Sequence, residues 1–165
     1  MEPNIFGGQY FESVFNVRKE GPSCFQVIGE RCSGTNYLQQ LILANTGLTV
    51  TNIAGWKHGF PVFAALPDTV VLIVIVRNAA SWARGMFIKP WHASPEMLDL
   101  DYDSFIRHRW NSYVDHSNNF DLPPGDDRVG KPLQYDRHPL TGVVFENIFQ
   151  LRRAKLEAHR GILSR

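Results

Sequence analysis

Residues 25–38 read Phe-Gln-Val-Ile-Gly-Glu-Arg-Cys-Ser-Gly-Thr-Asn-Tyr-Leu and combine a strand pattern, a turn and the start of a helix pattern. The aromatic and β-branched residues predict a strand over residues 23–28, and Gly29 ends that run. Ser33 is a favourable N-cap and aliphatic residues then recur at helical spacing, so we expect a helix from Ser33 to about Asn45. A strand that passes through a tight turn into a helix is typical of an α/β protein.

The turn between this strand and this helix has the properties of an anion site. The first N–H groups of a helix, here those of residues 33–36, have no partner within the helix and carry partial positive charge. Gly34 would let the backbone approach a ligand closely, and Thr35 and Asn36 add short polar side chains. Gly29 and Gly34 have the spacing of a nucleotide-binding P-loop, but Thr35 stands where that motif has lysine. An ordinary strand-to-helix turn therefore remains an alternative.

The composition is typical of one globular domain. The chain has 165 residues, 44% of them hydrophobic, which is enough to bury a core. A net charge of +1 gives no reason to expect nucleic acid or an anionic membrane as a partner. No apolar run has transmembrane length, no signal-peptide pattern occurs, and the two cysteines suit neither a disulfide framework nor a zinc site. We expect a single cytoplasmic domain over residues 1–165 without a membrane span.

The longest apolar run, Val-Val-Leu-Ile-Val-Ile-Val, occupies residues 70–76. Seven aliphatic residues in a row predict a strand that is buried on both faces, as at the centre of a parallel sheet. Arg77 follows directly and would lie at the carboxyl end of that strand, where open α/β sheets bind ligands. We therefore expect a three-layer α/β fold, in which helices flank a central parallel sheet with a P-loop-like turn.

The other elements are predicted from periodicity and turn residues. We expect a short strand over residues 49–53 and helices over residues 78–88, from Pro95 onward, over residues 103–116 and within residues 143–165. The helix over residues 103–116 would bury Phe105, Trp110 and Tyr113. The last helix would turn Arg152, Arg153, Lys155 and Arg160 to solvent, or alternatively to an anionic ligand.

Two segments are predicted to lack regular structure. Residues 119–142 are rich in Pro, Gly and Asp, so we expect a lid or a flexible loop. Residues 1–22 are expected to form an irregular lead-in or an edge strand. Lys57 and His58 lie in a further loop with two glycines and a proline, where they form a plausible catalytic pair, because histidine accepts a proton readily near neutral pH. A surface loop with two polar residues is the alternative for this pair.

The order of these features resembles the sulfotransferases that use 3′-phosphoadenosine 5′-phosphosulfate (PAPS). In that family the turn after the first strand reads basic-Ser-Gly-Thr-Thr or Asn and holds the 5′-phosphosulfate, and residues 31–36 are similar to it. The family's Lys-x-His-x-Pro-like loop corresponds to residues 57–61, and its Arg-Asn-Pro segment after a central strand corresponds to residues 77–79. The resemblance spans Phe25 to about Met86.

The resemblance implies in-line transfer of a sulfuryl group from PAPS to a hydroxyl or amine of a small-molecule or glycan acceptor, with no metal. It implies that Arg31, Cys32, Ser33, Gly34, Thr35 and Asn36 hold the 5′-phosphosulfate. Arg31 or Lys57 would offset negative charge on the leaving oxygen, and His58 would take the acceptor proton. Arg77, together with Ser81, would hold the 3′-phosphate. We expect the acceptor near Phe60, Trp91 and Tyr102.

The chain also departs from the family pattern. Cys32 stands where the family has its basic residue, and Lys57 lies one residue before His58 rather than two. Ala79 replaces a proline, and Gly85 occupies the position of a phosphate-binding serine. The family's C-terminal Gly-rich loop with lysine is not evident, so we expect a divergent or C-terminally truncated member.

Two other classes of protein remain open. A small P-loop kinase-like enzyme would need lysine after Gly34 and a magnesium-binding aspartate at a strand end, where Arg77 and Asn78 stand instead. A non-catalytic member would keep the anion turn and bind a nucleotide, another anion or a protein. Cys32, Gly85 and the missing C-terminal loop favour that second class.

Overall fold

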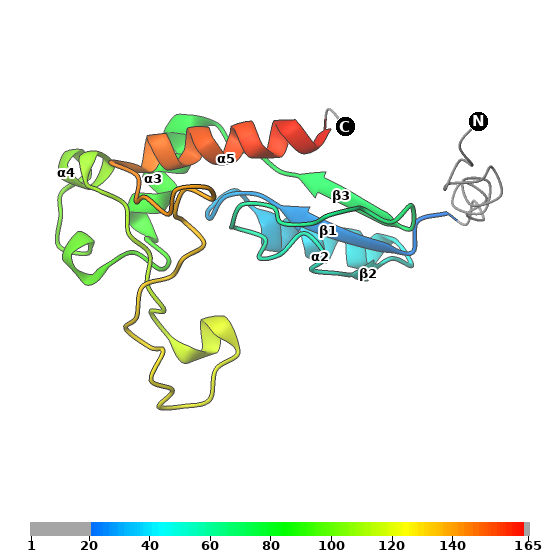
Figure 1. The fold of residues 1–165 in the computed structure, drawn as a ribbon, viewed down its shortest axis with the longest axis horizontal. Coiled ribbons are helices and arrows are strands. Elements are labelled where there is room, and N and C mark those ends of the chain that lie inside the picture. Colours follow the sequence, from blue (N-terminus) through cyan, green and yellow to red (C-terminus); the bar gives the residue numbers. More distant parts are fainter. Residues whose placement is uncertain (1–20, 164–165) are drawn as a thin grey trace, which may run out of the picture.

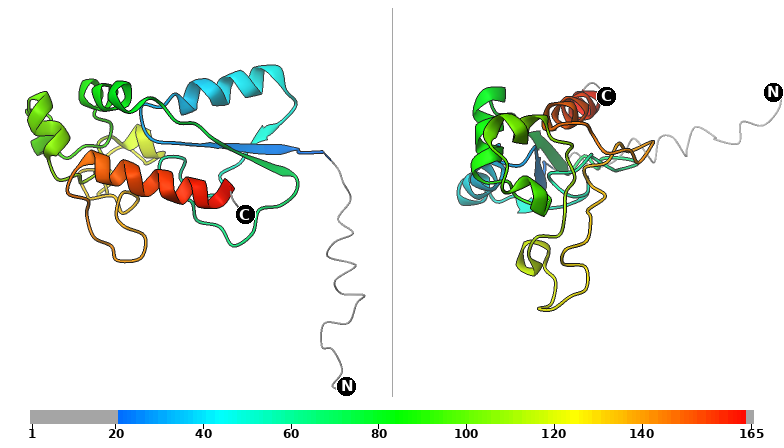
Figure 2. Two further views of the ribbon diagram at one scale, coloured as in Figure 1. Left: turned by 90° about the horizontal axis from the view of Figure 1, so that it is seen from above. Right: turned by 90° about the vertical axis from the view of Figure 1, so that its left-hand side faces the viewer.

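A small parallel sheet forms the middle of the molecule in the computed structural model, which describes residues 21–163. Strand β1 (Cys24–Ile28) lies between β2 (Thr49–Val50) and β3 (Val70–Val74), and both neighbours run parallel to it. Helices α2 (Thr35–Asn45) and α5 (Ile148–Leu163) lie on opposite sides of this sheet (Figures 1 and 2). The predicted α/β class, with a parallel sheet flanked by helices, is therefore confirmed. The lead-in expected over residues 1–22 lies almost wholly outside the described residues.

The central strand is β1, and the prediction that residues 70–76 form a central strand buried on both faces is wrong. Every residue of β1 after Cys24 is buried, including Gln26, whose amide donates to the Gly55 carbonyl at 2.7 Å and accepts from the Ala54 N–H at 2.8 Å. β3 lies at an edge and is half-buried, with Val71 36% exposed. The apolar run predicts a strand correctly, but tertiary neighbours decide which strand both sides of the sheet enclose.

Helix α3 (Ala79–Ile88) begins where the sequence predicts it. The Asn78 side chain caps it by accepting hydrogen bonds from the N–H groups of Ala80 and Ser81, at 3.1 and 3.2 Å. The helix expected from Pro95 is a single 3₁₀ turn, η1 (Pro95–Met97).

The helix predicted over residues 103–116 is wrong beyond its first half. Helix α4 (Tyr102–Arg107) ends at Arg107, and the chain runs extended from His108. The buried residues of this extended stretch are Trp110, Ser112 and Val114, and their spacing of two is the period of a strand rather than of a helix. Isolated bridges from Ser112 and its neighbour Tyr113 tie this stretch to Ala93 and Pro132, so tertiary pairing overrides the aromatic helix pattern.

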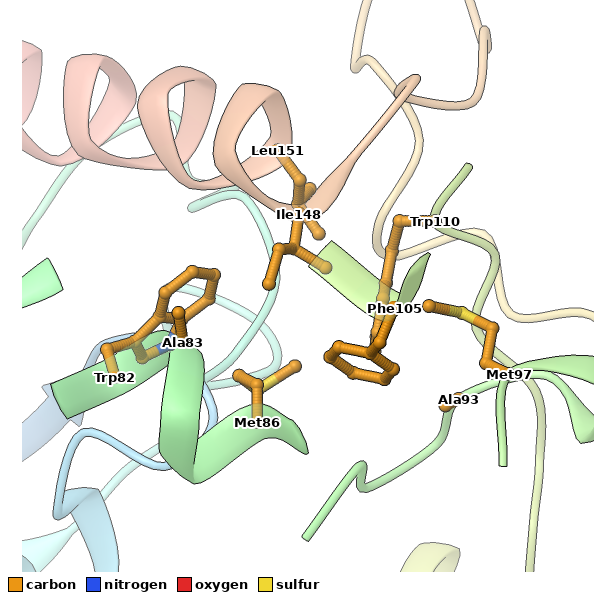
Figure 3. Packing of buried hydrophobic residues seen from close by; sticks show 9 residues of the cluster. All are labelled: Trp82, Ala83, Met86, Ala93, Met97, Phe105, Trp110, Ile148 and Leu151. Atoms are coloured by element: carbon orange, nitrogen blue, oxygen red, sulfur yellow. The ribbon is translucent and has the colours of Figure 1, made fainter. Parts of the chain in front are cut away.

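The main apolar core lies beyond the carboxyl end of the sheet, where α3, α4 and the first turn of α5 meet (Figure 3). Phe105 and Trp110 belong to it, as predicted, whereas Tyr113 is only half-buried and lies outside the cluster. The cluster consists of Trp82, Ala83, Met86, Ala93, Met97, Phe105, Trp110, Ile148 and Leu151.

Residues 119–142 form an irregular segment that starts in the 3₁₀ helix η2 (Ser117–Phe120) and projects away from the sheet (Figures 1 and 2). The segment then returns to the body of the molecule, where Leu133 and Asp136 are buried. Asp136 thereby becomes part of the charged interior described below. Within residues 21–163, no helix is both long and apolar enough to cross a membrane.

Candidate anion-binding site

The turn between β1 and α2 differs in one detail from its prediction. The N-cap of α2 is Gly34, at φ 92°, and not Ser33, which makes no side-chain capping bond. The Ser33 N–H instead donates to the Glu30 carbonyl at 3.2 Å, and its hydroxyl is buried without a partner among the described residues. Cys32 also has positive φ, at 60°. Two left-handed residues around Ser33 therefore tighten the turn and shift the helix start by one residue.

Four consecutive backbone donors are free at this helix start. The first bond of the helix runs from the Leu38 N–H to the Gly34 carbonyl, at 3.0 Å. Within the described part of the chain, the N–H groups of residues 34–37 donate to no protein atom. They carry the partial positive charge of the helix terminus and suit a phosphate or sulfate oxygen.

Helix α3 and the residue before its cap hold the turn in place. The Trp82 Nε1–H donates to the Arg31 carbonyl at 2.9 Å, and Arg77 Nη1 donates to the Cys32 carbonyl at 3.0 Å. These bonds take up two turn carbonyls, whose negative ends would otherwise repel an anion. Arg77 thus contacts the turn at the Cys32 carbonyl, while its side chain remains largely exposed.

The loop that carries Lys57 and His58 lies against the same turn. Gly29 donates its N–H to the Lys57 carbonyl at 2.9 Å, and His58 Nδ1 donates to the Gly29 carbonyl at 2.8 Å. Lys57 Nζ donates to the Asn36 side chain. A carbonyl can only accept, so the proton of neutral His58 is on Nδ1, and Nε2 is left as its acceptor.

Burial weakens both Lys57 and His58 as bases, and neighbouring cations add to this effect at His58. Burial lowers the pKa of His58 to about 3, and the charges of Arg31 and Lys57 add to the effect, although the Gly29 hydrogen bond opposes it. Burial also lowers the pKa of Lys57. At neutral pH His58 is therefore an uncharged imidazole whose protonated form is unfavourable.

One cavity of about 330 Å³ brings most of the predicted site residues together. Its lining includes all of residues 31–36 except Ser33, and both Lys57 and His58. Arg77 and Ser81 do not line it, and Trp91 does, unlike the other two residues expected near an acceptor, Phe60 and Tyr102. The remaining lining residues, which the sequence analysis did not assign to a site, are Trp56, His92 and Asn119.

Arg31 lines the cavity but is not a free cation. Its Nη2 lies 2.7 Å from Asp136 Oδ2, and its guanidinium lies over the rings of Trp56 and Trp110, at 4.9 and 5.7 Å. Lys155 Nζ contacts the other Asp136 oxygen, at 2.5 Å. Although burial alone would raise it, these two charges hold the pKa of Asp136 well below its ordinary value. Lys57 is therefore the cavity cation without a carboxylate partner among the described residues.

Helix α5 does not turn all its basic residues to solvent, which corrects the prediction for Arg152 and Lys155. Arg152 Nη1 pairs with Glu30 at 2.5 Å, and both side chains are at most 8% exposed. Burial raises the pKa of Glu30 to about 7, even though Arg152 and the other nearby cations oppose it. Arg153 and Arg160 are exposed, as predicted. The pair of Arg152 with Glu30 joins residues 122 positions apart, which no local pattern indicates.

The donors around the cavity define the kind of ligand that it suits. Backbone N–H groups and an ammonium group bind oxyanions, whereas residues 21–163 contain no cluster of three or more His, Cys, Asp or Glu side chains arranged to hold a metal ion. Cys24 and Cys32 are both free thiols. No family model, curated protein or solved structure matched the chain when it was compared with all three kinds.

Proposed function

We propose that this cavity binds PAPS and that the chain transfers its sulfuryl group to a hydroxyl or amine of a small-molecule or glycan acceptor. The observation that carries the proposal is that residues 34–36, whose N–H groups are free, line one cavity together with Lys57 and two imidazoles. This set of groups matches what sulfuryl transfer needs, namely oxyanion donors, a cation and a base. The free thiols suit a reducing cytoplasm, which is the setting that we propose.

In the proposed reaction the 5′-phosphosulfate lies on the free N–H groups. The acceptor oxygen or nitrogen forms a bond to sulfur while the bond from sulfur to the bridging oxygen breaks. The leaving adenosine 3′,5′-bisphosphate (PAP) keeps that electron pair, and Lys57 offsets its charge. The acceptor proton passes to an imidazole of the cavity, and the family resemblance assigns this role to His58.

The 3′-phosphate needs a separate group outside the turn. We assign it to Arg77, together with Ser81 on the first turn of α3, because both residues are exposed and Arg77 contacts the turn. The bond from Arg77 Nη1 to the Cys32 carbonyl supports this assignment, since it fixes the guanidinium next to the proposed phosphosulfate site.

Calorimetric titration of the full chain with PAP, and with ATP and magnesium as the comparison, tests the proposal. We expect PAP to bind more tightly than ATP. We also expect Arg77→Ala to weaken PAP far more than adenosine 5′-phosphate, and Arg84→Ala, at an exposed position on the nearby helix α3, to change neither. A preference for ATP with magnesium would favour a kinase-like enzyme, and binding of neither nucleotide would reject the proposal. Equal losses for the two adenosine ligands would remove Arg77 from the 3′-phosphate site.

A non-catalytic anion-binding protein is the second candidate, and two observations favour it. The Arg31 charge is neutralised by Asp136, so one expected cation is missing from the transfer site. A Cβ atom at Gly85 would lie 3.2 Å from Arg77 Nη1 and 3.3 Å from Cys32 Cβ, so the helix packs closely where the family has its serine. Tight PAP binding without release of PAP from PAPS would select this candidate.

A further inference from the structure

His92 lies in a strained turn just after α3, and Asp115 holds it at two points. Its backbone has φ 63°, in the left-handed region that few residues other than glycine adopt. The His92 N–H donates to Asp115 Oδ2 at 3.1 Å, and ring Nδ1 donates to Asp115 Oδ1 at 2.9 Å. One carboxylate therefore fixes both the backbone and the ring of this residue.

Asp115 is itself held as an ionised acceptor. The Asn119 side chain donates to its Oδ1 at 3.0 Å, and the His116 N–H donates to the same atom at 2.8 Å. Burial alone would raise the pKa of Asp115, but the hydrogen bonds from Asn119 and His92 outweigh it and lower the pKa. The carboxylate therefore stays charged beside the imidazole.

The His92 ring is directed by packing as well as by this bond. Its centroid lies 4.7 Å from that of Phe120 and 5.7 Å from that of Trp56, and the residue is 7% exposed. Because Nδ1 donates to Asp115, Nε2 is the ring's acceptor, and no described residue hydrogen-bonds to it. His92 lines the same cavity as the free N–H groups of the turn.

The two cavity histidines differ in the group that accepts a hydrogen bond from Nδ1, the ring nitrogen other than Nε2. The Nδ1 partner of His58 is the neutral Gly29 carbonyl, whereas the partner of His92 is a carboxylate that stabilises the imidazolium formed when Nε2 takes a proton. The groups that affect the His92 charge are Asp115, Arg31 and Asp136. Burial and Arg31 lower the pKa of His92, while the two carboxylates oppose that shift.

We infer that His92, and not His58, is the general base of the transfer, with Asp115 as its positioning residue. The inference rests on the proposed function. Nε2 takes the proton of the acceptor O–H or N–H as the new bond to sulfur forms, and PAP leaves with the electron pair of the broken bond. The imidazolium then returns its proton to solvent. The left-handed backbone at His92 is a strained geometry in a residue that lines the cavity.

Release of PAP from PAPS by the full chain tests the assignment, with 2-naphthol, glucosamine and water as acceptors. We expect His92→Asn to lower kcat about 10²–10⁴-fold while the Kd for PAP stays within about twofold. His58→Asn should lower kcat less. The matched control is His108→Asn, because His108 is only half-buried and lies outside the cavity, and it should leave kcat unchanged. Wild-type kcat in His92→Asn would overturn the assignment while leaving the proposed function intact.

The Asp115→Asn variant separates positioning from simple structural support. Loss of the carboxylate should lower kcat and should move the acidic limb of the pH–rate profile to lower pH, because the imidazolium loses its stabilising charge. An unmoved limb would contradict the role of Asp115. If the wild-type chain binds PAP but releases none from PAPS with any of these acceptors, transfer and base are both overturned and only binding stands.

A nitrogen-15 spectrum of the histidine rings gives a readout that does not depend on turnover. The signals of His92 are identified by their loss in His92→Asn. We expect the Nδ1–H tautomer, and we expect the Nε2 signal to move when PAP is added. The Nε2–H tautomer, or a His92 signal that ignores bound PAP, would overturn the inference.

Discussion

Asp136 joins three separate parts of the chain through one carboxylate. It pairs with Arg31 of the turn and Lys155 of α5, and it accepts the Trp110 Nε1–H at 2.9 Å. All four side chains are buried. Two cations this far from water depend on their partner, because a buried charge without a counterion is strongly unfavourable.

Replacement of this carboxylate should therefore destabilise the fold severely. We expect Asp136→Asn to lower the free energy of unfolding by about 3–5 kcal/mol, because it leaves Arg31 and Lys155 buried without a counterion. Urea unfolding followed by circular dichroism measures the change. The control is Glu157→Gln, which breaks the exposed pair with Arg153 on α5 and should barely move the midpoint. Similar midpoints for the two variants would contradict the role given to Asp136.

At the scale of elements, the end of β1 and the turn depend on a close approach to the chain beyond β3. A Cβ atom built on Gly29 would lie 2.5 Å from the Ile75 carbonyl oxygen and 2.8 Å from Ile75 Cγ2. Gly29 also exchanges hydrogen bonds with Lys57 and His58 through its N–H and its carbonyl. A side chain at this position would therefore push β1 away from the chain after β3 and from the loop with Lys57 and His58.

The Gly29→Ala variant tests this contact. We expect it to lower the free energy of unfolding by about 1–3 kcal/mol, since backbone atoms must move to admit the methyl group. It should also weaken PAP binding in calorimetry, because the loop with Lys57 shifts. Gly47→Ala is the matched control, since no heavy atom lies within 4 Å of the added Cβ. Wild-type stability in Gly29→Ala would show that the approach is not tight.

Helix α5 carries a buried histidine that makes the fold sensitive to acid. His159 is 2% exposed, and neither ring nitrogen has a partner among the described residues. Burial, with a smaller effect from Lys155, lowers the pKa of His159 from 6.5 to about 4. The folded state thus binds this proton less readily than the unfolded state. Its contribution to stability is present above pH 6.5 and is lost as the pH falls through about 4.

The variant His159→Leu should lose less stability on acidification than the wild-type chain. Between pH 8 and pH 5 we expect the difference to be about 1–2 kcal/mol, allowing for solvent screening. Urea midpoints at the two pH values measure it. His116→Leu removes an exposed imidazole and should keep the wild-type dependence. An equally steep loss in His159→Leu would mean that other groups control the acid limb.

At the scale of the whole molecule, two cations of α5 fasten the site to the sheet. Arg152 donates to Glu30 and to the Arg77 carbonyl, at 2.5 and 2.7 Å. Lys155 donates to Asp136 and to the His58 carbonyl, both at 2.5 Å. One helix thus holds the turn, the chain after β3 and the loop with Lys57 and His58 from the opposite side to α2 (Figure 2). The geometry of the cavity depends on this helix even though none of its residues lines it.

Local patterns in the sequence predict the fold class and the turn at residues 31–36. They do not predict which strand is central, because the apolar run of β3 looks more buried than β1, whose Gln26 is satisfied by a distant loop. Nor do they predict Asp136, which lies in a segment whose composition favours a loop. Its importance comes from Arg31 in the turn and Lys155 on α5, which meet it only in the folded chain. The periodicity of a segment depends only on residues that are close along the chain. It therefore does not indicate which side chain will pair with a buried charge in the folded protein.

The amphipathic pattern wrongly predicts a helix for the residues after Arg107, and the reason is related. The aromatic spacing favours a helix, yet Trp110 donates to Asp136. The residues after it form bridges to Ala93 and Pro132 instead. The sequence around His92 does not indicate a functional role for this residue, which only follows Pro90 closely. Its partner Asp115 lies 23 positions away. The paired histidine therefore emerges only from the folded chain.

The central claim is that an anion lies on the free N–H groups at the start of α2. A backbone amide nitrogen-15 NMR titration of the full chain with PAP tests it most directly. The largest shifts should fall on residues 34–37 and on the loop with Lys57 and His58, and inorganic sulfate should move the same helix-start signals at higher concentration. Signals of residues 34–37 that stay still while PAP moves others, such as Arg153 and Arg160 on the exposed face of α5, would contradict the claim.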